Sequence, residues 1–232
     1  MPAATYQKRR GEIETYFDRT AAEAWKRLTS DAPVGRIRAT VRAGRDTMRA
    51  TLLSWLPDDL TGIRLLDAGC GTGAFAVEAA RRGADVVAID VARNLVDLAR
   101  ERAPRDLGRG RVSFRVGDML DPALGRFDHV VGMDSLIHYT ADDYLRVLES
   151  LAPRTGRSIL FTFAPRTAPL AVMHAVGRLF PRGDRSPSLQ PLAESELRRR
   201  LAASRLLAGW SPARTHRVKS GFYTSQALEL LR

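Results

Sequence analysis

The sequence of 232 residues is poor in cysteine, in lysine and in long apolar runs. Cys70 is its single cysteine, so no internal disulfide can form, and we expect the chain to work in a reducing, cytoplasmic compartment. No stretch approaches the roughly 18 apolar residues needed to span a bilayer. Because the basic start is not followed by an apolar core, we expect no signal peptide either. These absences exclude a disulfide scaffold and a transmembrane helix, and they leave peripheral contact with a membrane open.

The charge of the chain is large, positive and unevenly placed. Its 37 Lys+Arg residues outnumber 26 Asp+Glu residues, which gives a formal charge of +11 at pH 7. Residues 61–150 hold 12 basic and 14 acidic side chains, whereas residues 151–232 hold 14 and 4. Such an excess suggests nucleic acid as a partner, but a solvated, arginine-rich face explains it equally well. The total charge therefore identifies no partner.

From residue 62 onward, short apolar runs alternate with segments of helical spacing, which is typical of strand–helix–strand units around a parallel sheet. The pattern predicts strands at 64–68, 85–90, 112–116, 129–134, 158–163, 214–219 and 222–228. It predicts helices at 75–82, 93–102, 142–151 and 194–203. Residues 1–60 have helical patterns, one around Tyr16 and one over 37–55. We therefore expect a helical arm at 1–60, an α/β domain at 61–232, and an insertion at 164–191 after the fifth strand.

The most informative stretch is a glycine-rich turn between the first strand and the first helix of this domain. It has the pattern Asp67-x-Gly69-x-Gly71-x-Gly73, and glycine there permits a tight turn and close approach of a ligand. The dinucleotide fingerprint has a different spacing, Gly-x-Gly-x-x-Gly. The present spacing resembles the first motif of class I S-adenosylmethionine-dependent methyltransferases. This resemblance implies a Rossmann-like fold with a mostly parallel seven-stranded sheet, and S-adenosylmethionine as cofactor with S-adenosylhomocysteine as product. Cys70 fits as a small spacer in this loop and not as a nucleophile.

Acidic residues lie at the carboxyl ends of the next predicted strands, the same position that the glycine loop has after the first strand. Asp90 ends the second strand, where a carboxylate accepts hydrogen bonds from both ribose hydroxyls in nucleotide-binding folds. The resemblance implies that Asp118 pairs with the adenine amino group and that Met119 adjoins the ring. Asp134, after the fourth strand, is a further cofactor-binding candidate. Each acid alone is explained as a helix cap or turn former, but their common register with Asp67 favours a cofactor site.

The segment after the fourth strand reads Leu136-Ile137-His138-Tyr139. Nucleic-acid N-methyltransferases commonly carry an Asn-Pro-Pro-Tyr-like tetrad here, which holds a flipped base. No proline occurs at this place, so we expect no nucleic-acid substrate. His138 lies just beyond a strand's carboxyl end, where doubly wound sheets present their chemistry, although a purely structural histidine fits equally well. The remaining histidines show no metal-ligand spacing, so we expect no metal site.

Beyond these motifs, the chain from about Tyr16 to its end resembles the magnesium protoporphyrin IX methyltransferase family of (bacterio)chlorophyll biosynthesis. The resemblance rests on short segments spread along the chain: Tyr16-Phe17 with Trp25, Arg38-x-Thr40-x-Arg42-x-Gly44-Arg45, Leu136-Ile137-His138-Tyr139, Phe163-Ala164-Pro165-Arg166-Thr167, Gly209-Trp210 and Phe222-Tyr223. It implies methyl transfer from S-adenosylmethionine to a propionate carboxylate of magnesium protoporphyrin IX, giving the monomethyl ester. The alternatives are another O-methyltransferase acting on a lipophilic small acid or phenol and, with less support, an RNA methyltransferase.

The resemblance also implies roles for particular residues. His138 and Tyr16 are expected to orient the propionate or the macrocycle, with contact between His138 and magnesium as a second option. The residues expected to bind the porphyrin are Tyr139, Arg166, Met173 and Phe180. Residues 169–180 are apolar at near-helical spacing, so they form either a packed core helix or a lid that covers the porphyrin and rests on a membrane surface. Handover of the porphyrin from the porphyrin-carrying subunit of magnesium chelatase is a further expectation.

Overall fold

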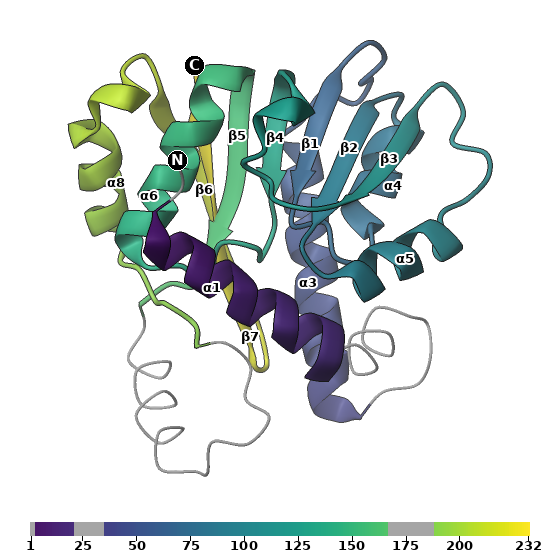
Figure 1. The fold of residues 1–232 in the computed structure, drawn as a ribbon, viewed down its shortest axis with the longest axis horizontal. Coiled ribbons are helices and arrows are strands. Elements are labelled where there is room, and N and C mark those ends of the chain that lie inside the picture. The colour runs from purple at the N-terminus through teal and green to yellow at the C-terminus, as the bar shows by residue number, and fades with distance from the viewer. Residues whose placement is uncertain (1–2, 21–34, 167–187) are drawn as a thin grey trace.

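The computed structural model describes residues 3–20, 35–166 and 188–232, and the described residues form a seven-stranded sheet with helices on both faces (Figure 1). The strand order is β3-β2-β1-β4-β5-β7-β6. The strands are β1 (Arg64–Ala68), β2 (Asp85–Asp90), β3 (Arg111–Val116), β4 (Phe127–Gly132), β5 (Thr155–Phe163), β6 (Ser211–Ser220) and β7 (Tyr223–Leu231). β1 to β5 are parallel, and β7 is antiparallel to both of its neighbours. The predicted Rossmann-like, mostly parallel fold is confirmed.

Except for the first, the helices agree closely with the predicted ranges. They are α1 (Ala4–Thr15), α3 (Arg36–Ser54), α4 (Ala74–Arg81), α5 (Arg93–Arg102), α6 (Ala141–Leu151) and α8 (Glu194–Ala203). The first helix differs from the prediction, because it begins at Ala4 and passes into a π-helical turn, η1 (Tyr16–Thr20). The Trp25 part of the predicted arm lies outside the described residues. In Figure 1, α1 lies across the carboxyl ends of the central strands.

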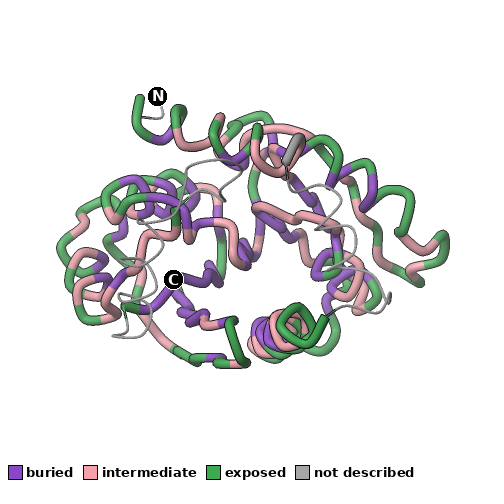
Figure 2. Tube along the Cα trace, turned by 90° about the horizontal axis from the view of Figure 1, so that it is seen from below, coloured by how far each residue is buried: buried purple, intermediate pink, exposed green. Residues whose placement is uncertain are grey.

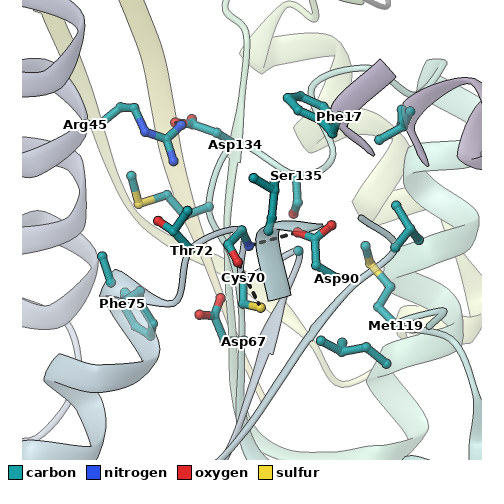
Figure 3. A pocket seen from close by; sticks show the side chains of 18 of the residues that line it. Phe17, Arg45, Asp67, Cys70, Thr72, Phe75, Asp90, Met119, Asp134 and Ser135 are labelled. Carbon is teal, nitrogen blue, oxygen red and sulfur yellow. Dashed lines mark hydrogen bonds and ion pairs between the residues drawn. The ribbon is translucent and has the colours of Figure 1, made fainter. Parts of the chain in front are cut away.

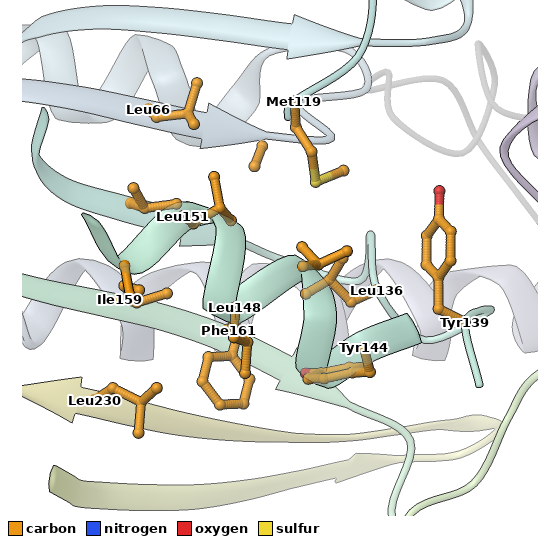
Figure 4. Close-up of a cluster of buried hydrophobic side chains, with 14 of the residues drawn as sticks. Leu66, Met119, Leu136, Tyr139, Tyr144, Leu148, Leu151, Ile159, Phe161 and Leu230 are labelled. Carbon is orange, nitrogen blue, oxygen red and sulfur yellow. The ribbon is translucent and has the colours of Figure 1, made fainter. Parts of the chain in front are cut away.

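Two apolar clusters hold the helices to the two faces of the sheet. One joins the sheet to α6 and α8 through residues such as Tyr144, Leu148 and Phe161 (Figure 4). The other joins it to α3 and α4 through residues such as Met48 and Ala79. Burial on both faces explains why the central parallel strands β1, β2 and β4 contain runs of apolar residues, whereas the edge strand β3 alternates exposed and half-buried residues. Figure 2, seen from below, shows these buried strands between the more exposed helices.

The two ends of the expected 164–191 insertion lie side by side at the end of β5. Pro165 and Leu192 form an isolated parallel bridge, and the backbone N–H of Arg166 donates to the Leu192 carbonyl at 2.9 Å. Met173 and Phe180 lie outside the described residues. In the part of the chain that the structure describes, no helix has the length and apolar character needed to cross a membrane.

Candidate functional site

A pocket of about 310 Å³ lies at the carboxyl ends of β1, β2 and β4 (Figure 3). This volume falls in the range of small-molecule sites. Its walls come from the glycine loop, the ends of β2 and β3, the segment after β4, one face of α3, and the end of the first helix with η1. The sequence places these segments far apart, and the sheet order brings them together.

The glycine loop takes backbone conformations that other residues rarely adopt. Gly69, Gly71 and Gly73 have φ angles of 85°, 52° and 78°. A Cβ atom added at Gly69 would overlap the side chain of Ser135, whereas one added at Gly71 would meet nothing within 4 Å. The loop therefore packs against the β4 segment at its first glycine and borders open space at its second, as a ligand cradle requires.

Asp90 supports this loop from the end of β2. Its Oδ2 accepts a hydrogen bond from the Gly71 N–H at 2.8 Å, and its Oδ1 accepts one from the Ala92 N–H at 2.9 Å. Burial raises the pKa of Asp90, although these backbone bonds oppose the shift. Asp90 lines the pocket, as the predicted ribose-binding role requires.

Asp67 lies beneath the loop with 2% of its surface exposed, and its Oδ2 has no hydrogen-bond partner. Burial, followed by the negative charge of Asp90, raises the pKa of Asp67 to about 7. Burial also raises the pKa of the Cys70 thiol, with the charges of Asp67 and Asp90 acting in the same direction. A protonated thiol is a weak nucleophile, which agrees with a spacer role for Cys70.

The carboxylate of Asp118 is held by α1. Tyr6 Oη donates to its Oδ1 at 2.7 Å, and Arg10 Nη1 lies 3.3 Å from its Oδ2. The ring of Tyr6 stacks on that of Tyr139, with the centroids 5.0 Å apart. Asp118 is not among the pocket-lining residues, but its neighbour Met119 is. The adenine contact expected of Asp118 remains a prediction, and the structure adds Tyr6 and Arg10 as the residues that orient this acid.

We expect Tyr6→Phe to lower the free energy of unfolding by about 1.5–3 kcal/mol, because it removes a hydrogen bond to a charged group and keeps the stacked ring. Chemical denaturation of the ligand-free protein measures the change. Gln7→Ala, on an exposed position of the same helix, serves as the control and should stay within about 0.5 kcal/mol of the parent. Equal stability of Tyr6→Phe and Gln7→Ala would show that α1 is not held through Asp118.

His138 and Tyr139, in the segment after β4, form part of the pocket wall. Both line the pocket and are buried, at 5% and 3% exposed. The ring of Phe17 also lines the pocket, 6.3 Å from the His138 ring. Tyr16 packs edge to face on Phe17, with the centroids 5.1 Å apart, and does not line the pocket. The structure thus places Phe17 at the pocket and Tyr16 behind it.

Asp134 lies at the pocket with its carboxylate occupied by protein donors, including Arg45 from α3 at 2.9 Å. Arg42 and Arg49 line the same wall. The resemblance motif contains Arg42 and Arg45 but not Arg49, and none of the three was predicted to line the site. Their recurrence at intervals of three and four residues was the signal that could have identified a cationic helix face.

Of the other predicted porphyrin-binding residues, Arg166 is the one that the structure describes, and it does not line this pocket. The side chain of Arg166 is 60% exposed and faces Glu196 of α8, with Nη2 3.7 Å from Oε2. Its predicted contact with the substrate stays a prediction, as do those of Met173 and Phe180.

The pocket suits a cofactor with ribose hydroxyls at one end and a charged group at the other. Asp90 presents a carboxylate at the end of β2, and the space beside Gly71 is open. The orphaned, buried oxygen of Asp67 and the arginines of α3 supply polar groups of both signs. The residues present therefore fit the cofactor that the glycine loop predicts.

Two family models match the chain: one described as the C-terminus of magnesium-protoporphyrin IX methyltransferase, over residues 132–232, and one described as a methyltransferase domain, over 65–154. A magnesium-protoporphyrin O-methyltransferase from Rhodobacter capsulatus is 56% identical over 99% of both chains. A crystal structure of magnesium protoporphyrin IX methyltransferase from Synechocystis PCC 6803 with bound SAH has a TM-score of 0.82. It is 30% identical and covers 95% of this chain and 98% of its own. A ubiquinone biosynthesis O-methyltransferase from Xanthomonas oryzae is 34% identical over 73% of this chain and 71% of its own.

The similarity to the Rhodobacter and Synechocystis proteins extends over nearly the whole of each chain, from the first helix through the antiparallel hairpin at the end of the sheet. The match to the ubiquinone enzyme covers a smaller share of this chain than the Rhodobacter match, and its sequence identity is lower. The chain belongs to the magnesium-protoporphyrin O-methyltransferase family.

Proposed function

We propose that this protein transfers the methyl group of S-adenosylmethionine to a propionate carboxylate of magnesium protoporphyrin IX, forming the monomethyl ester in (bacterio)chlorophyll biosynthesis. The main support is that one pocket joins the glycine loop and Asp90 to the buried pair His138 and Tyr139. The names of the Rhodobacter and Synechocystis proteins describe this activity for those relatives.

The reaction requires alignment more than proton transfer. When bound, S-adenosylmethionine supplies a methyl group on a positively charged sulfur, and a carboxylate oxygen takes this methyl while the bonding electron pair returns to sulfur. A propionate has a pKa near that of glutamate, about 4.3, so it is already ionised at neutral pH. No general base is needed. Holding two reacting groups in line can contribute roughly 7–11 kcal/mol in favourable cases.

The protein's own residues supply this alignment. Asp90 and the loop from Gly69 to Gly73 hold the cofactor end of the pocket. Phe17 and Tyr139 form apolar walls that exclude water from the reacting carboxylate. His138 lies on the same wall, where an imidazole can donate a hydrogen bond to a carboxylate oxygen.

We expect His138→Ala to lower the turnover rate by about 10- to 100-fold, because a hydrogen bond to the reacting carboxylate is worth about 1.5–3 kcal/mol. Affinity for S-adenosylhomocysteine, measured by calorimetry, should change less than twofold. His216→Ala, exposed on β6, is the matched control and should turn over at the parent rate. Wild-type turnover by His138→Ala would leave this histidine with a structural role only.

Tyr16→Phe is the companion variant for the second predicted orienting residue. Because Tyr16 packs on Phe17 and not on the pocket, a catalytic role requires its hydroxyl group to reach the substrate. The phenylalanine variant keeps the ring contact and removes only that group. A rate loss of about tenfold with unchanged stability supports the role, and an unchanged rate contradicts it.

The proposed function is tested by methyl transfer from labelled S-adenosylmethionine to magnesium protoporphyrin, with the product mass showing one added ester methyl group. Lipophilic phenols and acids are assayed in parallel, because the cofactor end of the pocket would serve another O-methyltransferase equally well. RNA binding is measured at several salt concentrations. A steep salt dependence with RNA and no porphyrin methylation would favour the nucleic-acid alternative.

Three finer predictions belong to the same proposal. They are that residues 164–191 cover the porphyrin, that this part of the chain contacts a membrane surface, and that the porphyrin is received from magnesium chelatase. The first is supported by the bridge between Pro165 and Leu192, which anchors both ends of the segment beside β5. Liposome sedimentation and porphyrin titration of a variant lacking 168–185 test the first two, and unchanged binding in both assays would contradict them.

A further inference from the structure

One face of α3 brings three arginines to the pocket. Arg42, Arg45 and Arg49 all line it, and their spacing of three or four residues places them on the same side of the helix. Arg49 is directed toward protein acids, since it lies 2.9 Å from Glu78 and 3.0 Å from Asp46.

Arg45 is held at the pocket by Asp134. Arg45 Nη1 donates to Asp134 Oδ2 at 2.9 Å, and the same carboxylate accepts hydrogen bonds from Thr162 Oγ1, Tyr223 Oη and Ser225 Oγ at 3.1, 3.0 and 2.9 Å. Asp134 is the one non-glycine residue with positive φ in the described part of the chain, at 54°. Its carboxylate is thus occupied by protein donors, one of which is the guanidinium of Arg45 (Figure 3).

The backbone around Arg45 is also seated against the sheet. A Cβ atom added at Gly44 would overlap the ring of Tyr223, so α3 approaches β7 directly at the residue before Arg45. The hydroxyl of that same tyrosine lies on Asp134. Tyr223 therefore positions both the helix and the carboxylate that hold the guanidinium.

The strand order indicates which end of a bound cofactor would lie beside Arg45 and Asp134. Asp90 ends β2, the glycine loop follows β1, and Asp134 follows β4, in the spatial order β2-β1-β4. Alternate strands lie about 10 Å apart. If Asp90 held the ribose, a cofactor lying across the glycine loop would bring its amino-acid end toward Asp134 and Arg45. That end carries a carboxylate, which needs a cationic partner in a half-buried site.

We propose that Arg45, positioned by Asp134, binds the carboxylate at the amino-acid end of the cofactor. This inference rests on the proposed function, since it assumes S-adenosylmethionine in the pocket. A guanidinium presents five N–H donors in a planar fork, so it can serve a ligand carboxylate together with Asp134. A porphyrin propionate shares the same chemistry, and the experiment distinguishes the two sources.

The test measures the binding of three ligands: S-adenosylhomocysteine and 5′-methylthioadenosine, which lacks the amino-acid end, by calorimetry, and magnesium protoporphyrin by absorbance titration. Arg45→Met should weaken S-adenosylhomocysteine binding by about 10- to 100-fold and leave methylthioadenosine binding within twofold of the parent. Arg45→Lys should restore part of the loss because it keeps the charge. Arg38→Met, an exposed change on the same helix, should alter none of these affinities. Methylthioadenosine binding also shows that each variant is folded.

Three results would overturn the proposal. They are unchanged S-adenosylhomocysteine affinity in Arg45→Met, equal losses for S-adenosylhomocysteine and methylthioadenosine, and a loss confined to magnesium protoporphyrin, which would assign Arg45 to a substrate propionate. Failure of the parent protein to bind S-adenosylhomocysteine at all would contradict the proposed function instead, so the two failures are distinguishable.

Discussion

Gly69→Ala is expected to destabilise the protein by about 2–5 kcal/mol and to slow methyl transfer about 100-fold. Gly69 has a φ of 85°, and a left-handed conformation costs a non-glycine residue about 1–2 kcal/mol. Its new methyl group would also overlap the side chain of Ser135, and overpacking of this kind costs about 1–3 kcal/mol. The loop must shift to relieve the overlap, and a displacement of about 1 Å at a ligand-bearing segment can cost a hundredfold in rate.

Two further variants separate strain from overlap. Gly62 has a similar φ of 78° in an exposed turn, and a Cβ added there meets nothing within 4 Å, so Gly62→Ala should lose only about 1–2 kcal/mol. Adding Ser135→Gly to Gly69→Ala removes the overlapping atom and should recover most of the remaining loss. Denaturant unfolding and the methyl-transfer assay give both quantities. If Gly69→Ala were no worse than Gly62→Ala, contact between the glycine loop and the β4 segment would not control the pocket.

The sequence predicted most of the fold because its local signals agreed with the buried sheet. The strands at 64–68 and 85–90 and the helix at 93–102 match their predicted ranges residue for residue. A parallel strand that is covered on both faces needs a run of apolar residues. In this chain a glycine or an acidic residue marks the place where such a run ends. Edge strand β6 was underestimated at both ends, because its pairing with β7 extends beyond its own pattern.

The first helix could not be located from its sequence because its position depends on distant partners. Only Tyr6 and Ile13 of α1 are buried, so the helix has little apolar periodicity of its own. Two hydrogen bonds hold it. Thr5 Oγ1 donates to Asp143 Oδ1 of α6 at 2.8 Å, and Tyr6 Oη donates to Asp118 Oδ1 at 2.7 Å. These pairs are separated by more than a hundred residues in sequence, and no local pattern reveals them.

The same limit applies to the site. The glycine loop and Asp90 were predictable because their chemistry is encoded in one short spacing. The contact between Arg45 and Asp134 joins residues 89 apart, and Phe17 reaches the pocket through the π-helical turn η1. Such residues become visible only when the sheet order brings the ends of β1, β2 and β4 together.

The second large effect expected is a pH-dependent stability caused by Asp67. Its pKa is raised from 3.8 to about 7 in the folded protein, first by burial and then by the charge of Asp90. Between pH 3.8 and 7 the folded state therefore retains a proton that the unfolded state has lost. The free energy of unfolding falls by about 1.4 kcal/mol per pH unit in this window and levels off above pH 7. The penalty is absent at low pH and complete at high pH, opposite to that of an ion-paired carboxylate.

Asp67→Asn isolates this contribution, because an amide does not titrate. Its stability relative to the parent should rise by about 3 kcal/mol between pH 5 and pH 8, where the parent loses its buried proton. Urea unfolding of both ligand-free proteins at each pH measures this difference, in which titrating groups that do not interact with Asp67 cancel. Asp85→Asn is the control: hydrogen bonding to Arg111 lowers the pKa of Asp85, so its difference from the parent should stay constant over the same interval. Parallel curves for Asp67→Asn and the parent between pH 5 and pH 8 would contradict the raised pKa of Asp67 and with it this prediction.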